Sequence, residues 1–141
     1  TRDLIRRNQK NPYYYELLGD IEYQMGHYDD AVVAYERALE LDKNAPQIQT
    51  ALALVLAERG KPGDNARGIE LCKTSLLATP APLTYWVMGK LYDDGREYWA
   101  LAEYYNMTGN AKKARTFAKR AQQKLDKDSP EYIKASDILN M

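Results

Sequence analysis

The feature that most constrains the fold is the return of similar residues at a fixed distance along the chain. Three pairs are separated by 34 positions: Pro12 and Pro46, Gly26 and Gly60, and Gly19 and Ala53. A period of this length is typical of helix–turn–helix units, each of which buries its apolar side only against the next unit. The chain is therefore expected to be all-α and to stack antiparallel helix hairpins.

The first repeat indicates that this spacing serves packing. Asn11 and Pro12 suit the N-cap and the first position of a helix, and Gly26 suits the positive φ at a helix end. In the second helix of the hairpin, one stripe is formed by Ala31, Tyr35, Ala38 and Leu39. The small residue Gly19 lets the two helices approach closely, and the ring of Tyr35 fills the space between them.

This arrangement resembles the tetratricopeptide (TPR) repeat. Tyr15 occupies the position of the large aromatic residue, Leu18 and Gly19 form the Leu-Gly pair, and Gly26 is the turn glycine. The clear departure is Glu22, where the TPR pattern prefers Tyr. The resemblance implies a TPR-like right-handed superhelix of about 3.5 repeats that ends in a C-terminal capping helix.

The expected organisation is one TPR domain over residues 11–141, preceded at 1–10 by the remnant of an earlier helix. The repeats are expected at about 12–45, 46–81, 82–108 and 96–127, with the capping helix at 129–140. The last two repeats overlap because Asp93, Asp94 and Gly95 end one helix early. The helix that follows, at about 96–107, then closes one hairpin and opens the next.

Longer strings are similar to a narrower family, the BepA-like bacterial HExxH zinc metalloproteases of the periplasm. The strings are NPYYYELLGDIEYQMG at 11–26, WALAEYYNMTGNAKKARTFAKRAQQKL at 99–125 and DSPEYIKASDIL at 128–139. The resemblance implies a C-terminal TPR region that docks on an upstream protease domain and recruits substrates or assembly partners. It also implies a periplasmic or cell-envelope location, and zinc only in the protease domain. A free-standing TPR adaptor that scaffolds a complex with no protease attached is the alternative, and it leaves a cytoplasmic location open.

The residue inventory does not favour catalysis. A zinc protease site needs two His and a Glu on one helix, and this chain has a single His, His27, in an expected turn. Asp29 is interpreted as an N-cap and Cys72 as a small core residue. We therefore expect a non-catalytic module with no cofactor and no metal of its own in this segment.

A partner is expected to bind where the first helices of successive repeats line a concave groove. The groove positions are Tyr13, Glu16, Asp20, Tyr23, Gln47, Thr50, Leu54, Glu58, Trp86, Lys90, Asp93, Trp99, Glu103 and Asn106. These residues are acidic and aromatic, which favours a protein or peptide segment that is basic or apolar. The two Trp rings are either groove anchors or packing residues at the irregular junction.

Charge is unevenly distributed although the net charge is zero. Residues 13–42 carry eight acids against one base, and residues 110–127 carry seven bases against one acid. The imbalance is compatible with a monomer whose basic face is solvated, or with weak head-to-tail self-association. Only Phe117 interrupts the basic segment, so nucleic acid is not an expected partner.

The longest apolar run, 51–57, is far shorter than the roughly 20 residues of a membrane helix, so membrane insertion is not expected.

Overall fold

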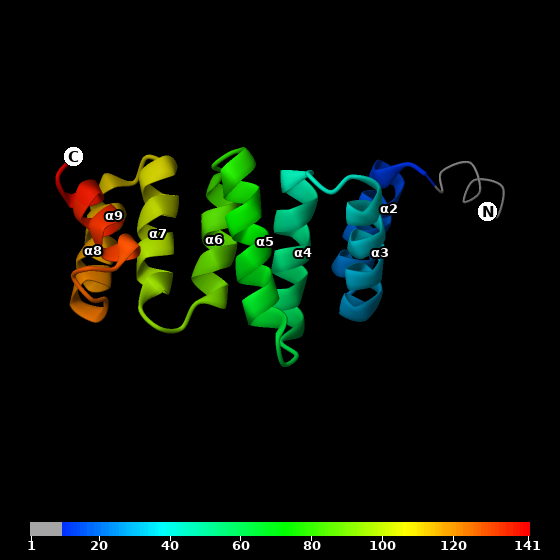
Figure 1. The fold of residues 1–141 in the computed structure, drawn as a ribbon, viewed down its shortest axis with the longest axis horizontal. Coiled ribbons are helices and arrows are strands. Elements are labelled where there is room, and N and C mark those ends of the chain that lie inside the picture. Colours follow the sequence, from blue (N-terminus) through cyan, green and yellow to red (C-terminus); the bar gives the residue numbers. More distant parts are fainter. Residues whose placement is uncertain (1–9) are drawn as a thin grey trace. The chain divides into compact units, whose positions relative to one another are not determined.

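A computed structural model describes residues 10–141 of the chain (Figure 1). The predicted remnant of an earlier helix falls almost wholly on residues 1–9, which lie outside the described residues. The chain divides into two compact units, of which unit 1 ends at Thr79 and unit 2 runs from Pro80 to Met141. The predicted handedness of a superhelix, and a groove continuous through both units, stay predictions.

The part of the chain from residue 10 onward is helical with short connections, and it contains no strand (Figure 1). The helices are α2 (Pro12–Gln24), α3 (Tyr28–Leu41), α4 (Pro46–Arg59), α5 (Asp64–Ala78), α6 (Pro82–Leu91), α7 (Arg96–Met107), α8 (Ala111–Lys124) and α9 (Pro130–Leu139). The prediction of an all-α helical repeat is confirmed.

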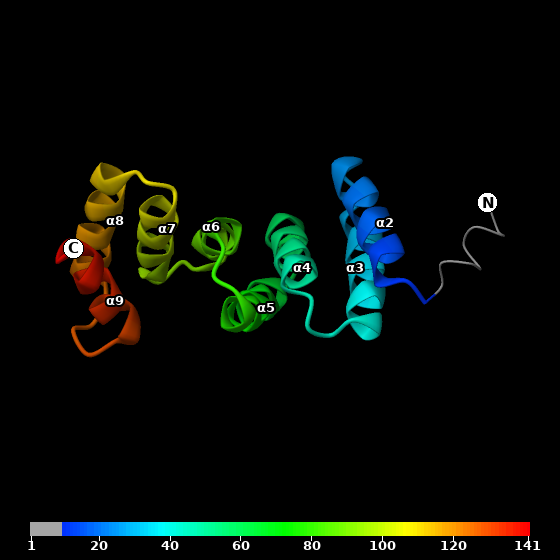
Figure 2. The same cartoon turned by 90° about the horizontal axis from the view of Figure 1, so that it is seen from above.

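Unit 1 consists of two helix hairpins, α2 with α3 and α4 with α5, and α3 also packs against α4. Figures 1 and 2 both show α2 beside α3 and α4 beside α5. The predicted local signals start and end these helices. Asn11 Oδ1 accepts the Tyr13 N–H at 2.9 Å, and Pro12 occupies the first turn. Gly60 ends α4 in the left-handed conformation, at φ 68°.

The core of unit 1 is built from small and aliphatic side chains of α3 and α4, with Tyr35 at its α2 side. A Cβ atom on Gly19 of α2 would lie 2.6 Å from Cε1 of Tyr35, so glycine is needed for this close contact. The hydroxyl of Tyr35 donates a hydrogen bond to Asp20, which ties the ring to α2 a second time. The predicted packing of Gly19 against Tyr35 is confirmed.

An ion-pair network closes the turn between α4 and α5. Arg59 donates from Nε and Nη2 to the two carboxylate oxygens of Asp64, each at 2.9 Å. The exposed Asp29 of α3 accepts hydrogen bonds from Arg59 and Lys61. The interpretation of Asp29 as an N-cap is therefore wrong: the N-cap residue of α3 is His27, and Asp29 lies in the first turn and binds the neighbouring hairpin.

Unit 2 is organised around α7, which packs against α6, α8 and α9. Helix α6 is short, with ten residues. Gly95, at φ 104°, is the N-cap residue of α7 and ends the connection between the two helices. Asn110 and Ser129 cap α8 and α9 through their side chains. Helix α7 lies at the predicted 96–107, and α9 lies within the predicted 129–140, while the predicted division into overlapping repeats stays a prediction.

None of the helices in the described part of the chain has both the length and the apolar character needed to cross a bilayer.

Candidate protein-interaction surfaces

The predicted groove residues of unit 1 lie on α2 and α4, and we call their accessible set the α2–α4 face. Its members are Tyr13, Glu16, Asp20, Tyr23, Gln47, Leu54 and Glu58, all of them exposed or half-buried. Thr50 is the exception, because only 3% of its surface is exposed. Its hydroxyl lies 2.9 Å from the Ser75 hydroxyl of α5, which donates to the Pro46 carbonyl. The prediction that Thr50 lines a groove is therefore wrong.

The α2–α4 face holds its acidic groups close together. Burial, and then the charge of Asp20, raise the pKa of Glu16, while a hydrogen bond with Gln47 lowers it. Burial, and then the charge of Glu58, raise the pKa of Tyr23. Crowded carboxylates disfavour one another's ionised form, so a cation brought to this face would relieve their repulsion.

The predicted groove residues of unit 2 divide between surface and core. Trp86 is 38% exposed, its ring centroid lies 5.6 Å from that of Tyr104, and Lys90 Nζ lies 5.4 Å from its centroid. Asp93 is exposed, and Glu103 and Asn106 are half-buried. For Trp86, exposure fits the surface alternative.

Trp99 belongs to the core of unit 2, with only 3% of its surface exposed. Its ring meets the edge of Tyr85 at a centroid distance of 5.8 Å, and Lys134 of α9 lies 5.2 Å from its centroid. The prediction that Trp99 lines an open groove is wrong because α9 packs against α7 and covers this ring. The packing alternative holds for Trp99.

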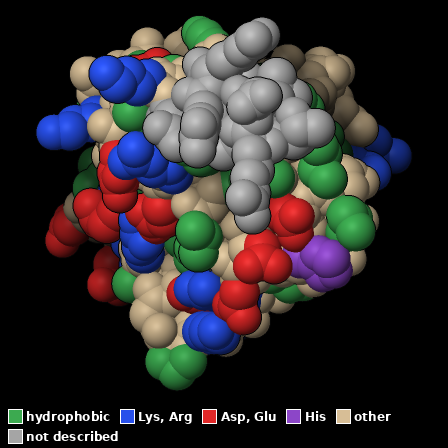
Figure 3. Space-filling model, turned by 90° about the vertical axis from the view of Figure 1, so that its right-hand side faces the viewer, with side chains coloured by type: hydrophobic (Ala, Val, Ile, Leu, Met, Phe, Trp, Pro, Cys, Tyr) green, Lys and Arg blue, Asp and Glu red, His purple; other side chains and the backbone are tan. Residues whose placement is uncertain are grey.

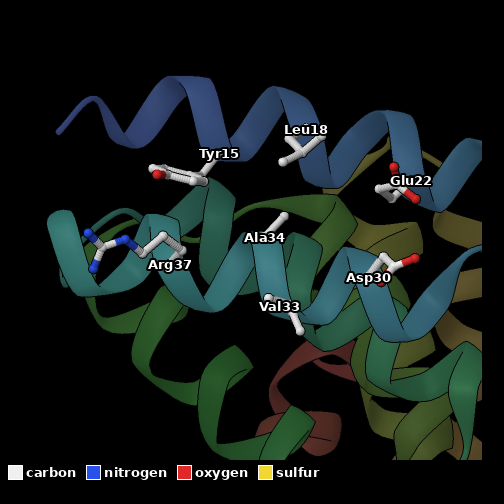
Figure 4. Close-up of a pocket in the computed structure, with 7 residues that line it drawn as sticks. All are labelled: Tyr15, Leu18, Glu22, Asp30, Val33, Ala34 and Arg37. Atoms are coloured by element: carbon white, nitrogen blue, oxygen red, sulfur yellow. The ribbon is translucent and has the colours of Figure 1, made fainter. Parts of the chain in front are cut away.

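A surface groove that was not predicted from the sequence runs between α2 and α3, with a volume of about 490 Å³. It is lined by Tyr15, Leu18, Glu22, Asp30, Val33, Ala34 and Arg37 (Figure 4). Leu18 and Ala34 form its middle, Glu22 and Asp30 lie at one end, and Tyr15 and Arg37 lie at the other (Figure 4). We call this the α2–α3 groove.

A second apolar stripe on α2 lies beside this groove, and its residue Leu18 also lines the groove. Tyr14, Leu18, Ile21 and Met25 follow one another at helical spacing, on a different side of α2 from Gly19. Val33 on α3 is 68% exposed, and Ile21 and Met25 are also exposed. Side chains of both charges and hydrophobic side chains occur together on the side of the molecule shown in Figure 3.

One end of the α2–α3 groove brings a His and two carboxylates together. Potential ligand atoms of Glu22, His27 and Asp30 lie within 4.8 Å of one another, and His27 Nδ1 is 2.8 Å from Glu22 Oε2. Counting residues of each type gave no sign of this cluster, because it forms across the α2–α3 turn. Two of the three side chains are exposed, so solvent competes for any ion held there.

The two charged segments differ in how their charges are compensated. Most acids of α2 and α3 have partners within unit 1: Glu22 with His27, Asp29 with Arg59 and Lys61, Glu36 with Arg67, and Glu40 with Arg37. The Lys and Arg side chains of α8, by contrast, form no ion pair with any acid among residues 10–141. The ring of Phe117 on α8 stacks with the rings of Tyr98 and Tyr105 on α7. Three aromatic rings therefore lie near the basic side chains of α8, and not Phe117 alone.

The hairpins and their exposed faces define the class of this protein, an all-α helical repeat. A family model described as TPR repeat matches residues 19–60, from the interior of α2 through α3 and α4 to Gly60. This match and the fold support the prediction of a TPR domain, a kind of domain that generally mediates protein–protein interaction and is typically non-catalytic. No curated protein matches the chain. The similarity to BepA-like proteases stays a prediction.

Proposed function

We propose that this chain is a non-catalytic module that binds other proteins, and that the α2–α4 face of unit 1 is its peptide-binding surface. The observation that carries the proposal is that residues 19–60, which match the TPR repeat, include the C-terminal part of α2 from Gly19 onward and all of α3 and α4. One side of α4 belongs to the core of unit 1, while Gln47, Leu54 and Glu58 on α4 are exposed or half-buried, as are Tyr13, Glu16, Asp20 and Tyr23 on α2.

The chemistry of the α2–α4 face favours a segment with Lys or Arg beside apolar residues. Glu16, Asp20 and Glu58 supply negative charge, and Tyr13, Tyr23 and Leu54 supply apolar contact area. Tyr rings are effective anchors in interfaces because they bring a large area at low entropic cost and keep a hydroxyl for hydrogen bonding. The partner's cations would lower the repulsion among the crowded carboxylates.

A displayed random-peptide library tests this proposal. Enrichment of sequences with basic and apolar residues is expected, followed by measurement of one enriched peptide by fluorescence anisotropy. Tyr13→Ala and Glu58→Lys should each weaken binding about tenfold, or roughly 1.4 kcal/mol. Glu70→Lys on α5 makes the same charge change at an exposed site outside the face, and should leave binding unchanged. Enriched peptides that bind all three variants equally would refute the assignment of this face.

We further propose that the module belongs to a bacterial zinc metalloprotease of the cell envelope, where it recruits substrates or assembly partners and docks on the protease domain. The support is the sequence similarity of the three strings at 11–26, 99–125 and 128–139. In this proposal zinc is bound only by the protease domain, and the location is periplasmic. An HExxH segment upstream in the parent reading frame would support it, and a start codon directly before Thr1 would contradict it and favour a free-standing adaptor.

A further inference from the structure

We propose that the α2–α3 groove is a self-complementary dimerisation surface, on which a second copy of this chain pairs its α3 antiparallel to the first. The two-fold axis would pass between Val33 and Ala34. Asp30 of each copy would then lie opposite Arg37 of the other. A two-fold dimer is the commonest form of soluble homo-oligomer, and it requires one patch to complement itself.

The order of residues on α3 satisfies this requirement. Asp30, Val33, Ala34 and Arg37 all line the groove and follow one another at helical spacing. Turning such a stripe by 180° about its midpoint exchanges Asp30 with Arg37 and Val33 with Ala34. Unlike charges therefore meet at both ends. In the middle, the exposed Val33 of each copy would lie over the small, buried Ala34 of the other, which lets the helix axes come close.

The free surface at this stripe is suited to burial. Val33 is 68% exposed, and Leu18 and Ala34 add apolar side chains to the groove beside it. Ile21 follows Leu18 by three positions, so it extends the apolar surface on the α2 side. Apolar side chains gathered on an exposed surface favour burial against a partner.

The charged groups at the two ends of the stripe allow Asp30 of one copy to pair with Arg37 of the other. Asp30 forms no ion pair with any base in the described part of the chain, so it is available to a second copy. Arg37 uses Nη1 to bind Glu40 at 2.7 Å, and its guanidinium carbon lies 5.8 Å from the Tyr15 ring centroid. A guanidinium has five N–H donors, so Arg37 can bind Asp30 of a second copy and keep Glu40. Glu22 and His27, beside Asp30, leave that end acidic.

Sedimentation equilibrium of the whole chain tests the proposal, at low salt, in EDTA, and up to about 1 mM protein. The wild type should show a monomer–dimer equilibrium. Asp30→Arg and Arg37→Asp should each weaken it about tenfold, because each change turns both symmetry-related pairs into repulsions. An equimolar mixture of the two variants should form a heterodimer, and the double variant should regain homodimers, since both restore unlike pairs.

Two further variants test the apolar centre. Val33→Lys should reduce dimerisation about tenfold or more, while Leu77→Lys, the same kind of change at an exposed site on α5, should not. Circular dichroism verifies that each variant is folded. A wild type that stays monomeric, as it would if another segment or partner filled the groove, overturns the proposal. Dimers that need a divalent metal, or a variant mixture that stays monomeric, overturn it as well.

Discussion

Substituting Gly19 with Ala tests the contact on which the first hairpin depends. In the interior of an exposed helix, this change stabilises a protein by roughly 1 kcal/mol, because alanine is the better helix former. Here the new methyl group would lie 2.6 to 2.8 Å from three ring carbons of Tyr35. The ring is buried, with 2% of its surface exposed, so it has little room to move away.

The expected net effect is destabilisation of about 2 kcal/mol. Forcing an extra methyl group into a packed core costs about 1 to 3 kcal/mol. Shifting the ring also strains the hydrogen bond from the Tyr35 hydroxyl to Asp20, which is worth about 1 kcal/mol. These costs together exceed the gain in helix propensity. For a chain of this size the midpoint of thermal unfolding should fall by about 5 to 10 °C.

Urea unfolding followed by far-ultraviolet circular dichroism measures the effect. Gly89→Ala on α6 is the matched control, because the new Cβ would lie 3.1 Å from the end of the flexible Leu101 side chain rather than against a ring. It should stay within about 1 kcal/mol of the wild type. A Gly19→Ala variant as stable as the wild type, or more stable, would refute the reasoning that helix approach requires glycine here.

Three other substitutions or measurements follow from side chains whose surroundings the structure defines. Trp99→Ala should cost about 3 to 5 kcal/mol by denaturant unfolding, whereas Trp86→Ala should cost less than about 1 kcal/mol; equal effects would contradict the different burial of the two rings. Asp64→Asn should cost about 1 to 3 kcal/mol at pH 7, because the hydrogen bonds from Arg59 hold the pKa of Asp64 below its usual value of 3.8. The stability that Asp64 contributes is present above pH 3.8 and is lost as the pH falls through its lower folded pKa, so the two proteins should converge in strong acid. Burial raises the pKa of the Cys72 thiol to about 12, so a thiol reagent should label the native protein slowly at pH 8 and the urea-unfolded protein fast; fast native labelling would show that the site opens.

The helices could be predicted from sequence because their limits depend on neighbouring residues. Pro12, Pro46 and Pro82 each begin a helix, since proline fits the first turn, where its missing N–H has no intrahelical partner. Gly60 ends α4 because it adopts a left-handed conformation that other residues avoid. Such signals act within a few positions and need no knowledge of the tertiary structure.

The surfaces could be predicted only in part, because exposure depends on helices distant in sequence. Thr50 stands at a position expected to face a groove, but Ser75 of α5 covers it. Trp99 is buried because α9 returns to pack against α7. The α2–α3 groove could not be predicted either, because its lining combines residues of two helices whose relative placement depends on their packing.

The central place of α7 limits how this chain could grow by duplication. A helical stack usually lengthens when one more hairpin is inserted between two existing ones, because each hairpin contacts only its neighbours. Between α6 and α7 such an insertion would separate α6 from α7, the helix on which it mainly packs within unit 2. The junction between α3 and α4, where one complete hairpin meets the next, is the place where an added hairpin could be accommodated.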